Sequence, residues 1–529
     1  MKFLPLFIIL IFSITACDIL NIEDDLETQS NEIIKKNIHY QKCASDIYVN
    51  TTAQDDHVFD ICDGKGDCNL VDAIETANLC NEVTTIHLEA GEVYFLTEAA
   101  YFTKKEQLNG TYQLISNRVQ KDSGLPLIKT TIIIEGNGAI IKRRVSKLST
   151  GRKQNFTEKE EEVLFRIIHN SKRGNLTLKN VTILDGNIGE NSYDPDSRSG
   201  NGGAIYNLGE LTVENCQFEG NVASQNGGAI FSLKPIIISN SVFNDNHATN
   251  DGGGIFMLGT DIMTIESSTF TQNTSGNYGG AIFSNAELLL TSSNISFNNS
   301  NRRGGGIYLG RDDALQFDFI SKPDYSPAFI DQCIFESNEA TQAGGGIFCE
   351  ITEGDDDNMG YPLASTPINL TMQRTTISGN IAGRGGGIMN WFATMYTKDI
   401  TVVNNQAHQD YDSGAGGGIH FEFGFAHMEN TVVAQNPVGG DIGGVTSNFS
   451  YISESTNFIG DQTFTDVNII HGNPMLNPLS ISGNTKVHIP MSGSPLINAG
   501  TATSCLSTDQ RGLSRPVGSA CDLGAVEVQ

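Results

Sequence analysis

NGGAIYNLGELTVENCQFEGN, residues 201 to 221, combines a glycine pair, an isoleucine, an alternating run of apolar residues and a closing asparagine. Glycines of this kind suggest a phosphate-binding loop, but such a loop needs a strand before it and a helix after it. The residues that follow these glycines alternate with a period of two instead, which indicates strands. The stretch is therefore better tested as one unit of a repeat.

The stretch returns along the chain in two linked elements. The first is a glycine pair followed by Ala or Gly and then Ile, with successive spacings of 25, 25, 27, 25, 40, 41 and 31 residues. Its isoleucines are Ile205, Ile230, Ile255, Ile282, Ile307, Ile347, Ile388 and Ile419. The second element is an apolar residue followed three positions later by Asn. Its asparagines are Asn187, Asn221, Asn246, Asn273, Asn298, Asn338, Asn380, Asn405 and Asn436. Two elements that keep step in this way indicate internal repetition.

A repeat of this length predicts an all-β, single-stranded parallel β-helix, or β-solenoid. Short strands with glycine turns cannot bury their apolar side alone, so each unit must stack on its neighbours. The glycines allow tight corners and close contact between coils. The isoleucines, and the apolar residues before each Asn, are expected to form internal columns. The asparagines are expected to lie at a bend and to hydrogen-bond from coil to coil as a structural ladder without a catalytic role.

An aromatic column follows the isoleucines. Its members are Tyr206, Phe231, Phe256, Phe283, Tyr308, Phe348, Met389 and His420. Strand alternation would turn this column outward, as a stripe on which sugar rings or another protein could dock. The alternative, which we favour, is a corner where both columns pack inward or under a loop.

The net charge is strongly negative, with 33 Lys and Arg against 61 Asp and Glu, or −28 over 529 residues. This charge repels a phosphate backbone, so nucleic acid is excluded as an expected partner. The acidity fits an exported protein and a role for divalent cations.

The first residues, MKFLPLFIILIFSITAC, read as a secretion signal. Their ending resembles a bacterial lipobox, in which Cys17 is lipid-modified and becomes the mature N-terminus. The alternative is an ordinary signal peptide cleaved after Ala16. Residues 18–45 read as a polar tether, and no later segment is apolar enough to span a membrane.

Nine cysteines follow Cys17, and most lie near the two ends of the chain. This distribution is expected if disulfides staple the ends of the solenoid in an oxidising compartment. The cysteines expected to form disulfides are Cys62, Cys68, Cys505 and Cys521, with the connectivity left open. The odd number leaves at least one free thiol.

Both ends of the chain resemble known families. VNTTAQDDHVFDICDGKGDCNLVDAIETAN, residues 49–78, is similar to the N-terminal domain of CSLREA proteins, although its motif is degenerate. GSPLINAGTATSCLSTDQRGLSRPVGSACDLGAVE, residues 493–527, closely resembles the tail of choice-of-anchor Q proteins. The two repeat elements resemble the repeat of chlamydial polymorphic membrane proteins, which are adhesins. These resemblances imply a right-handed parallel β-helix of the pectin-lyase-like type at the cell surface or exported.

These observations divide the chain into five parts: a signal peptide (1–17), the tether (18–45), an N-terminal cap with the first coils (46–130), the β-helix repeats (131–445) and the final coils with a C-terminal cap (446–529). Insertions are expected near 310–330 and 350–368, where two repeat intervals are long. They leave neighbouring coils at the same place and should lie side by side, and such insertions often carry binding.

The candidate site residues lie in and after these insertions. They are Asp312, Asp313, Asp355, Asp356, Asp357, Trp391, His420 and Glu422. The aspartates are candidate calcium ligands, because calcium prefers several carboxylates; two solvated acidic loops are the alternative that we favour. His420 and Glu422, on one face of a strand, could act as acid and base, but isolated surface residues are the expected outcome.

The leading functional hypothesis is a non-enzymatic, surface-associated lipoprotein that acts as an adhesin or a glycan-binding scaffold. Its expected partner is a polysaccharide or a cell-surface ligand, and no cofactor other than calcium is expected. The alternative is a polysaccharide lyase or glycoside hydrolase, because enzymes of both kinds share this fold, although neither family's diagnostic motif occurs here and fold alone does not establish activity. A structural envelope protein is the third hypothesis.

Overall fold

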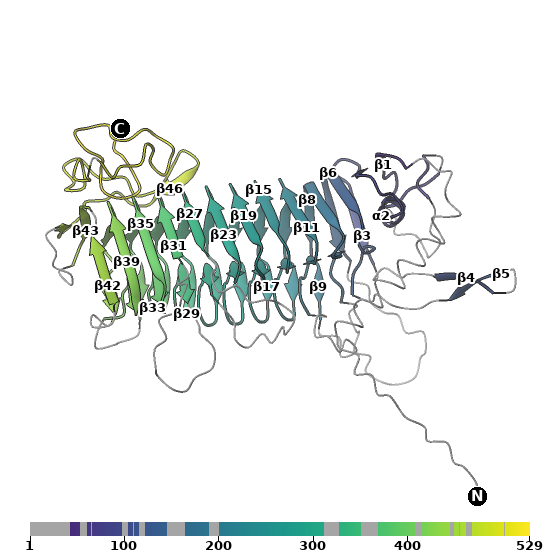
Figure 1. The fold of residues 1–529 in the computed structure, drawn as a ribbon, viewed down its shortest axis with the longest axis horizontal. Helices are drawn as coiled ribbons and strands as arrows, with labels where there is room; N and C mark the ends of the chain where they lie inside the picture. Colours follow the sequence, from purple (N-terminus) through teal and green to yellow (C-terminus); the bar gives the residue numbers. More distant parts are fainter. Residues whose placement is uncertain are drawn as a thin grey trace, which may run out of the picture.

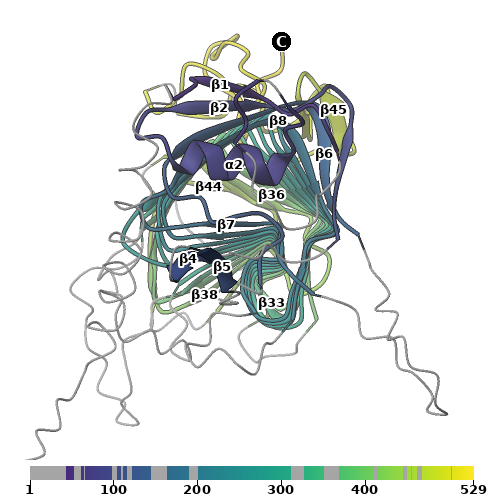
Figure 2. The same ribbon diagram turned by 90° about the vertical axis from the view of Figure 1, so that its right-hand side faces the viewer.

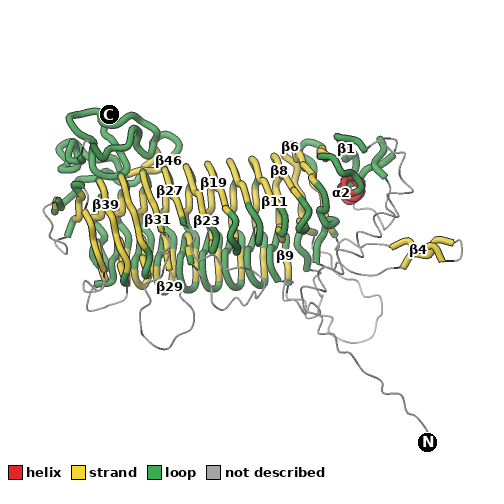
Figure 3. Tube along the Cα trace, viewed as in Figure 1, coloured by secondary structure: helices red, strands yellow, loops and turns green. Residues whose placement is uncertain are grey.

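The computed structural model describes most of the chain from Cys43 onward. The described residues are 43–52, 61–64, 66–97, 104–108, 111–115, 122–144, 164–189, 200–310, 327–350, 369–408, 414–444, 449–453, 455–461, 468–501 and 503–529. They form a rod of stacked coils with the N-terminal coils at one end and the C-terminal coils at the other (Figure 1). Figure 3 shows that strands dominate and that the described residues contain a single helix.

Three parallel sheets run along the rod, as a right-handed parallel β-helix requires. The main sheet consists of β1 (Asp46–Tyr48), β2 (Thr84–His87), β3 (Val93–Leu96), β6 (Thr131–Arg143), β8 (Asn175–Leu184), β11 (Glu210–Glu214), β12 (Gln217–Glu219), β15 (Ile236–Ser239), β16 (Val242–Asn244), β19 (Ile262–Glu266), β20 (Thr269–Thr271), β23 (Glu287–Thr291), β24 (Asn294–Ser296), β27 (Ala328–Asp331), β28 (Ile334–Glu336), β31 (Asn369–Gln373), β32 (Thr376–Ser378), β35 (Thr394–Lys398), β36 (Thr401–Val403), β39 (Gly424–Glu429), β40 (Val432–Ala434), β42 (Phe449–Ser453), β43 (Asn457–Ile459) and β44 (Ile469–Ile470).

The other two sheets are smaller. The glycine sheet, named for the glycine pair before most of its strands, consists of β7 (Ile168–Asn170), β10 (Ile205–Asn207), β14 (Ile230–Ser232), β18 (Ile255–Met257), β22 (Ile282–Ser284), β26 (Ile307–Leu309), β30 (Ile347–Glu350), β34 (Ile388–Trp391), β38 (Ile419–Glu422) and β41 (Ile442–Gly444). The third sheet consists of β9 (Asn187–Ile188), β13 (Val222–Ala223), β17 (His247–Ala248), β21 (Thr274–Ser275), β25 (Asn299–Ser300), β29 (Glu339–Ala343), β33 (Ile381–Arg384) and β37 (Gln406–Ala407). Two antiparallel hairpins, β4 (Lys104–Leu108) with β5 (Thr111–Ile115) and β45 (Ser480–Ser482) with β46 (Thr485–Val487), stand apart from these sheets.

The isoleucine column is in register from coil to coil. Ile205 pairs with Ile230, and the pairing continues to Ile419 and one coil further to Ile442. All of these side chains lie in one continuous apolar core. The glycine pair brings the coils into contact, because a Cβ on Gly228 would lie 2.1 Å from the carbonyl oxygen of Gly253.

Two of the bends that turn each coil around the core lie just before and just after its second main-sheet strand. At the first bend, within the main sheet, one residue per coil has a positive φ, as at Asn215 and Asn240. At the second bend, before the third sheet, the asparagines of the repeat form a ladder. Asn298 shows the pattern: its Nδ2 donates to Asn338 Oδ1 at 2.9 Å, and its own Oδ1 accepts from both the backbone N and the Nδ2 of Asn273.

The ladder runs from Asn221 to Asn436, and every member is buried. It ends on a carboxylate, because Asn436 donates to Asp441 Oδ1 at 2.9 Å. Asn187 is not a member, and its assignment to the ladder is wrong by one residue. Asn187 pairs with Val222, so Gly186 occupies the ladder position and donates its backbone N–H to Asn221 Oδ1. The reason is that Ile183, which pairs with Phe218, is the core residue of this coil, whereas Leu184 is half-buried.

The aromatic column is buried and does not form an exposed stripe. Phe231, Phe256, Phe283 and Tyr308 stack on one another with ring centroids 4.6 to 5.3 Å apart. They form a second apolar cluster on the opposite side of the glycine sheet from the main core. Residues that precede glycine strands cover some of the rings: Tyr278, before β22, stacks on Tyr308 at 4.8 Å, and Arg303, before β26, lies over Phe348 at 5.1 Å. The structure therefore shows the corner arrangement, in which the isoleucine column and the aromatic column are both buried.

Helix α2 (Leu70–Asn78) closes the N-terminal end of the rod (Figure 2). Its Ala73, Ile74 and Ala77 are fully buried in the core, and Asn69 caps its N-terminus by accepting a hydrogen bond from the backbone N of Asp72. Disulfides Cys43–Cys80 and Cys62–Cys68 tie this end together.

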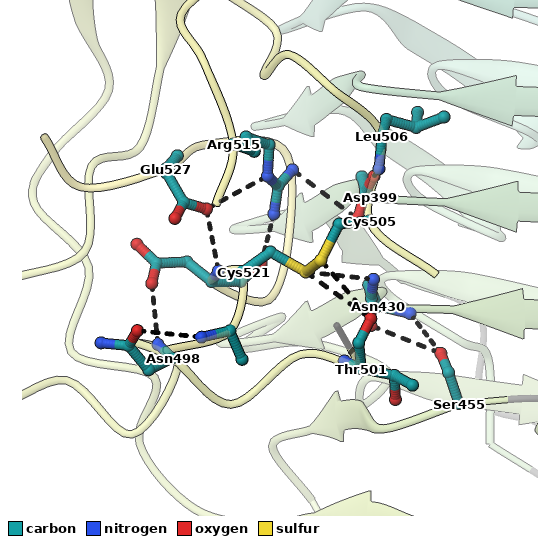
Figure 4. The surroundings of a disulfide bond; sticks show 12 residues. Asp399, Asn430, Ser455, Asn498, Thr501, Cys505, Leu506, Arg515, Cys521 and Glu527 are labelled. Carbon is teal, nitrogen blue, oxygen red and sulfur yellow. Dashed lines mark hydrogen bonds and ion pairs between the residues drawn. A yellow bond between two sulfur atoms is a disulfide. The ribbon is translucent and has the colours of Figure 1, made fainter. Parts of the chain in front are cut away.

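The C-terminal segment, residues 472–529, lies on the outer face of the main sheet over the last coils (Figure 1). A third disulfide, Cys505–Cys521, holds it (Figure 4). Arg515 is buried between Asp399 of the rod and Glu527 of the segment, with Arg515 Nη1 3.6 Å from Asp399 Oδ1. Burial raises the pKa of Asp399, and Arg515 partly offsets that rise.

The remaining cysteines of the described chain, Cys216, Cys333 and Cys349, are buried and free.

Replacing one ladder residue should be costly. Asn298→Ala removes the acceptor of two buried N–H groups on Asn273 and the donor to Asn338, and it should lower the free energy of unfolding by about 3 kcal/mol. Urea unfolding followed by circular dichroism measures the loss. The control is Asn301→Ala, an exposed asparagine three residues away, which should unfold like the wild type. Equal losses in the two variants would contradict the role of the ladder.

Candidate functional site

The predicted acidic loops lie outside the described residues. Asp312 and Asp313 fall in 311–326, and Asp355, Asp356 and Asp357 fall in 351–368; Cys17 also lies outside. The structure does show where both insertions begin. They follow β26 and β30, in which Leu309 and Cys349 are paired neighbours.

Trp391, His420 and Glu422 lie close together on two adjacent strands. Trp391 pairs with Glu422, and His420 is two residues from Glu422 on the same strand, β38. His420 is only 2% exposed, and its Nε2 is 3.9 Å from Glu422 Oε2. The expectation of isolated surface residues is therefore wrong. The physical reason is the covered corner: His420 continues the buried aromatic column below Met389.

Two arginines organise this corner, which we call the arginine cluster: Arg303, Tyr308, Glu350, Arg384, Trp391, His420 and Glu422. Arg303 donates to Glu350 at 2.9 Å, and Arg384 donates to Glu422 at 2.6 Å. Both guanidinium groups lie over the ring of Trp391, at 5.5 and 5.6 Å from its centroid. Cation–π contacts of this kind stabilise the stack and fix the orientation of the indole.

Burial controls the proton affinities in the arginine cluster. Tyr308 is fully buried and donates to Glu350 Oε2 at 2.6 Å, and its burial and the Glu350 charge raise its pKa well above the ordinary value. Burial, together with the Arg384 charge, lowers the pKa of His420 to about 4. His420 is therefore neutral near pH 7, and the cluster holds Trp391 in place by paired charges.

A second group of aromatic side chains faces solvent beside this corner. We call Phe392, Tyr396, Phe423, Phe425 and His427 the aromatic platform. Phe392 stacks on Phe423 at 4.3 Å, and Tyr396 stacks on His427 at 4.5 Å, each pair joining two adjacent coils. Tyr396 is 39% exposed and Phe425 is 45% exposed. Exposed rings held parallel in this way offer a flat apolar surface with polar edges.

Sequence reasoning did not find the aromatic platform. The repeat defines inward positions, whereas Tyr396 and Phe425 occupy outward positions of β35 and β39, which the repeat leaves free to vary from coil to coil. The signal that could have found them is the pair of aromatic-rich stretches WFATMY and FEFGFAH, residues 391–396 and 421–427, which lie one coil apart.

Two further observations bear on the site. Among the described residues, no group of three or more His, Cys, Asp or Glu side chains is arranged to hold a metal ion. In the same part of the chain, no helix is long and apolar enough to cross a membrane.

The repeat of this chain is similar to a known one. Residues 215–233, 240–257, 267–285 and 332–350 each match the Chlamydia polymorphic membrane protein repeat. Each match begins at or just after the first bend of one coil and ends in or just after the glycine strand of the next, so it contains one asparagine of the ladder and one glycine pair. No curated protein matches the chain.

The buried His420 predicts a pH dependence of stability. Its folded pKa, about 4, lies below the unfolded value near 6.5, so the unfolded chain binds a proton that the folded chain excludes as pH falls through this window. Stability should therefore decrease from pH 7 to pH 5, with about 2 kcal/mol of the decrease due to His420. His420→Met, which copies Met389 of the adjacent coil, should abolish that part.

The measurement is the free energy of unfolding of wild type and variant at both pH values. The control is His408→Met, at an exposed histidine just after β37, which should follow the wild type. An unchanged pH dependence in His420→Met would show that this histidine does not carry the effect.

Proposed function

We propose that this β-helix, which carries repeats of the polymorphic membrane protein type, acts at the cell surface as a non-enzymatic adhesin that binds glycans. The observation that carries the proposal is the aromatic platform. Tyr396 and Phe425 are exposed, and the ring stacking across two coils fixes Tyr396, Phe392, Phe423 and His427 before any ligand arrives. Preorganised aromatic surfaces lose little conformational entropy on binding.

The chemistry of the aromatic platform suits sugars. A pyranose ring has apolar C–H faces and polar edges, so it can stack on Tyr396 and Phe425 while its hydroxyl groups hydrogen-bond to polar neighbours. Thr394 and Thr371, which pair with Phe425 and Tyr396, supply hydroxyl groups beside these rings. Trp391, held by the arginine cluster, lies next to Phe392 with ring centroids 6.4 Å apart.

The proposal also includes a lipid anchor on Cys17 and a calcium site in the two insertions. A lipid on Cys17 would attach the chain to a membrane, and residues 18 to 42 would then separate the rod from the bilayer. Carboxylates of the two acidic insertions, which follow the paired strands β26 and β30 in the sequence, would bind calcium.

A glycan array tests the proposal. The full chain should bind a subset of surface polysaccharides or oligosaccharides, and Tyr396→Ala combined with Phe425→Ala should reduce binding at least about 10-fold, because two stacking contacts are lost. The matched control is Tyr48→Ala at the far end of the rod, where Tyr48 stacks on His87 at 4.6 Å in a similar Tyr–His pair. This control should bind normally.

The same array distinguishes the other functions. Running it with and without calcium tests the acidic loops, and assaying bound polysaccharides for new reducing ends or unsaturated products tests for a hydrolase or lyase. Formation of either product would show that the protein is a hydrolase or lyase and would contradict the non-enzymatic adhesin. Binding that survives in the double variant, or no binding to any glycan, would contradict the proposed role of the aromatic platform.

A further inference from the structure

A continuous track runs along the outer face of the main sheet at its first bend. One residue per coil has a positive φ there, and these residues are stacked through ten successive coils. In order along the rod they are Asn137, Asn180, Asn215, Asn240, Ser267, Ser292, Gln332, Arg374, Asp399 and Asn430. We call this column the bend track.

The C-terminal segment already occupies the last part of the bend track. The backbone N of Thr501 donates to Asn430, and that of Leu506 donates to Asp399 (Figure 4). One coil further back, Arg374 Nη1 donates to Thr508 at 2.6 Å, and Gln332 Nε2 then donates to the carbonyl oxygen of Asp509 at 3.4 Å. The segment therefore runs along the rod, from the C-terminal coils toward the N-terminal ones.

The spacing shows why a polypeptide fits this track. Rings stacked between coils lie 4.6 to 4.7 Å apart, so the two coil steps from Asp399 to Gln332 cover about 9 to 10 Å. The three residues from Leu506 to Asp509, at about 3.3 Å each, cover the same length. An extended chain thus presents one polar group to each coil that it crosses: the backbone N of Leu506, the hydroxyl of Thr508 and the carbonyl oxygen of Asp509.

The N-terminal part of the bend track is open. A groove of about 580 Å³ lies along it and is lined by Asn137, Asn180, Asn215 and Asn240. Asn137 and Asn180 each use Nδ2 in a hydrogen bond to the protein, whereas Asn215 and Asn240 make no side-chain hydrogen bond within the described part of the chain. Both of these amides are exposed to solvent.

From these observations we propose that the open part of the bend track binds an extended peptide segment of a partner protein. The three coil steps from Asn137 to Asn240 span about 14 Å, which four to five extended residues cover. Asparagine amides suit such a ligand because each offers both a donor and an acceptor to peptide N–H and C=O groups. The occupied half of the track makes the same kind of bond between side chains and a peptide backbone.

The ligand should be neutral or basic. The residues just before the bend in the open part are Glu135, Lys179, Glu214 and Ser239, and Lys179 is paired with Glu214 at 2.8 Å, which leaves the carboxylate of Glu135 in excess. This excess of carboxylates disfavours an acidic peptide. A second copy of this chain's C-terminal segment does not fit either, because Arg374 and Asp399, which receive that segment, are replaced by asparagines in the open part.

Peptide selection on the full chain tests the proposal. A phage-displayed heptapeptide library is selected against the wild type, and the enriched peptides are synthesised and titrated by fluorescence anisotropy. Asn215→Gly combined with Asn240→Gly removes both free amides and keeps the positive φ that glycine tolerates. The dissociation constant should rise at least about 10-fold in this variant and should also rise with salt for basic peptides.

The matched control is Asn404→Gly, another exposed asparagine with positive φ, at the second bend on a distant coil. It should bind the peptides like the wild type, as should the Tyr396→Ala and Phe425→Ala variant, which separates this site from the proposed glycan surface. Failure to enrich any peptide, or equal binding to the double glycine variant, would overturn the proposal. A glycan whose binding is lost in that variant would assign the groove to sugars and would also overturn it.

Discussion

The close stacking of coils is the constraint on which the rest of the structure depends. Successive coils can approach to strand-pairing distance only if the corners carry no bulky atoms and the buried polar groups are paired. The glycine pair meets the first condition, since a Cβ on Gly253 would lie 2.2 Å from the carbonyl oxygen of Gly280. The asparagine ladder meets the second, because each buried amide bonds to the next and the last bonds to Asp441. With both conditions met, the apolar columns stack in register over the length of the rod.

A rod built in this way makes its outer surface the place where function varies. Inward positions are fixed by stacking, so changes there cost stability, whereas outward positions are free to carry different chemistry on each coil. Two outward features carry the proposed binding surfaces. The aromatic platform presents Tyr396 and Phe425 to solvent near the C-terminal coils, and the open part of the bend track presents free amides near the N-terminal coils. Their separation along the rod allows two ligands to bind at once.

The sequence predicted the repeating part of the fold because stacking imposes the same requirement on every coil. Eight of the nine expected ladder asparagines lie in the ladder, and Asn187 fails because Leu184 was taken as the core residue in place of Ile183. Only the structure could establish that the aromatic column is buried, because strand alternation predicts the direction of a side chain but not what covers it. The same limit applied to His420. The aromatic platform and the docking of the C-terminal segment depend on contacts between residues far apart in sequence, which no local pattern specifies.

The most direct test of the ladder as the organising interaction is hydrogen–deuterium exchange, read residue by residue, on the intact chain. The backbone amides of Asn246, Asn273, Asn298 and Asn338 each donate to the side chain of the next coil and are buried, so they should be among the slowest to exchange and should exchange at similar rates. Amides of exposed turn residues such as Lys172, for which no backbone hydrogen bond is found in the described part of the chain, should exchange much faster. Ladder amides that exchange as fast as these, or at unrelated rates from coil to coil, would contradict the account.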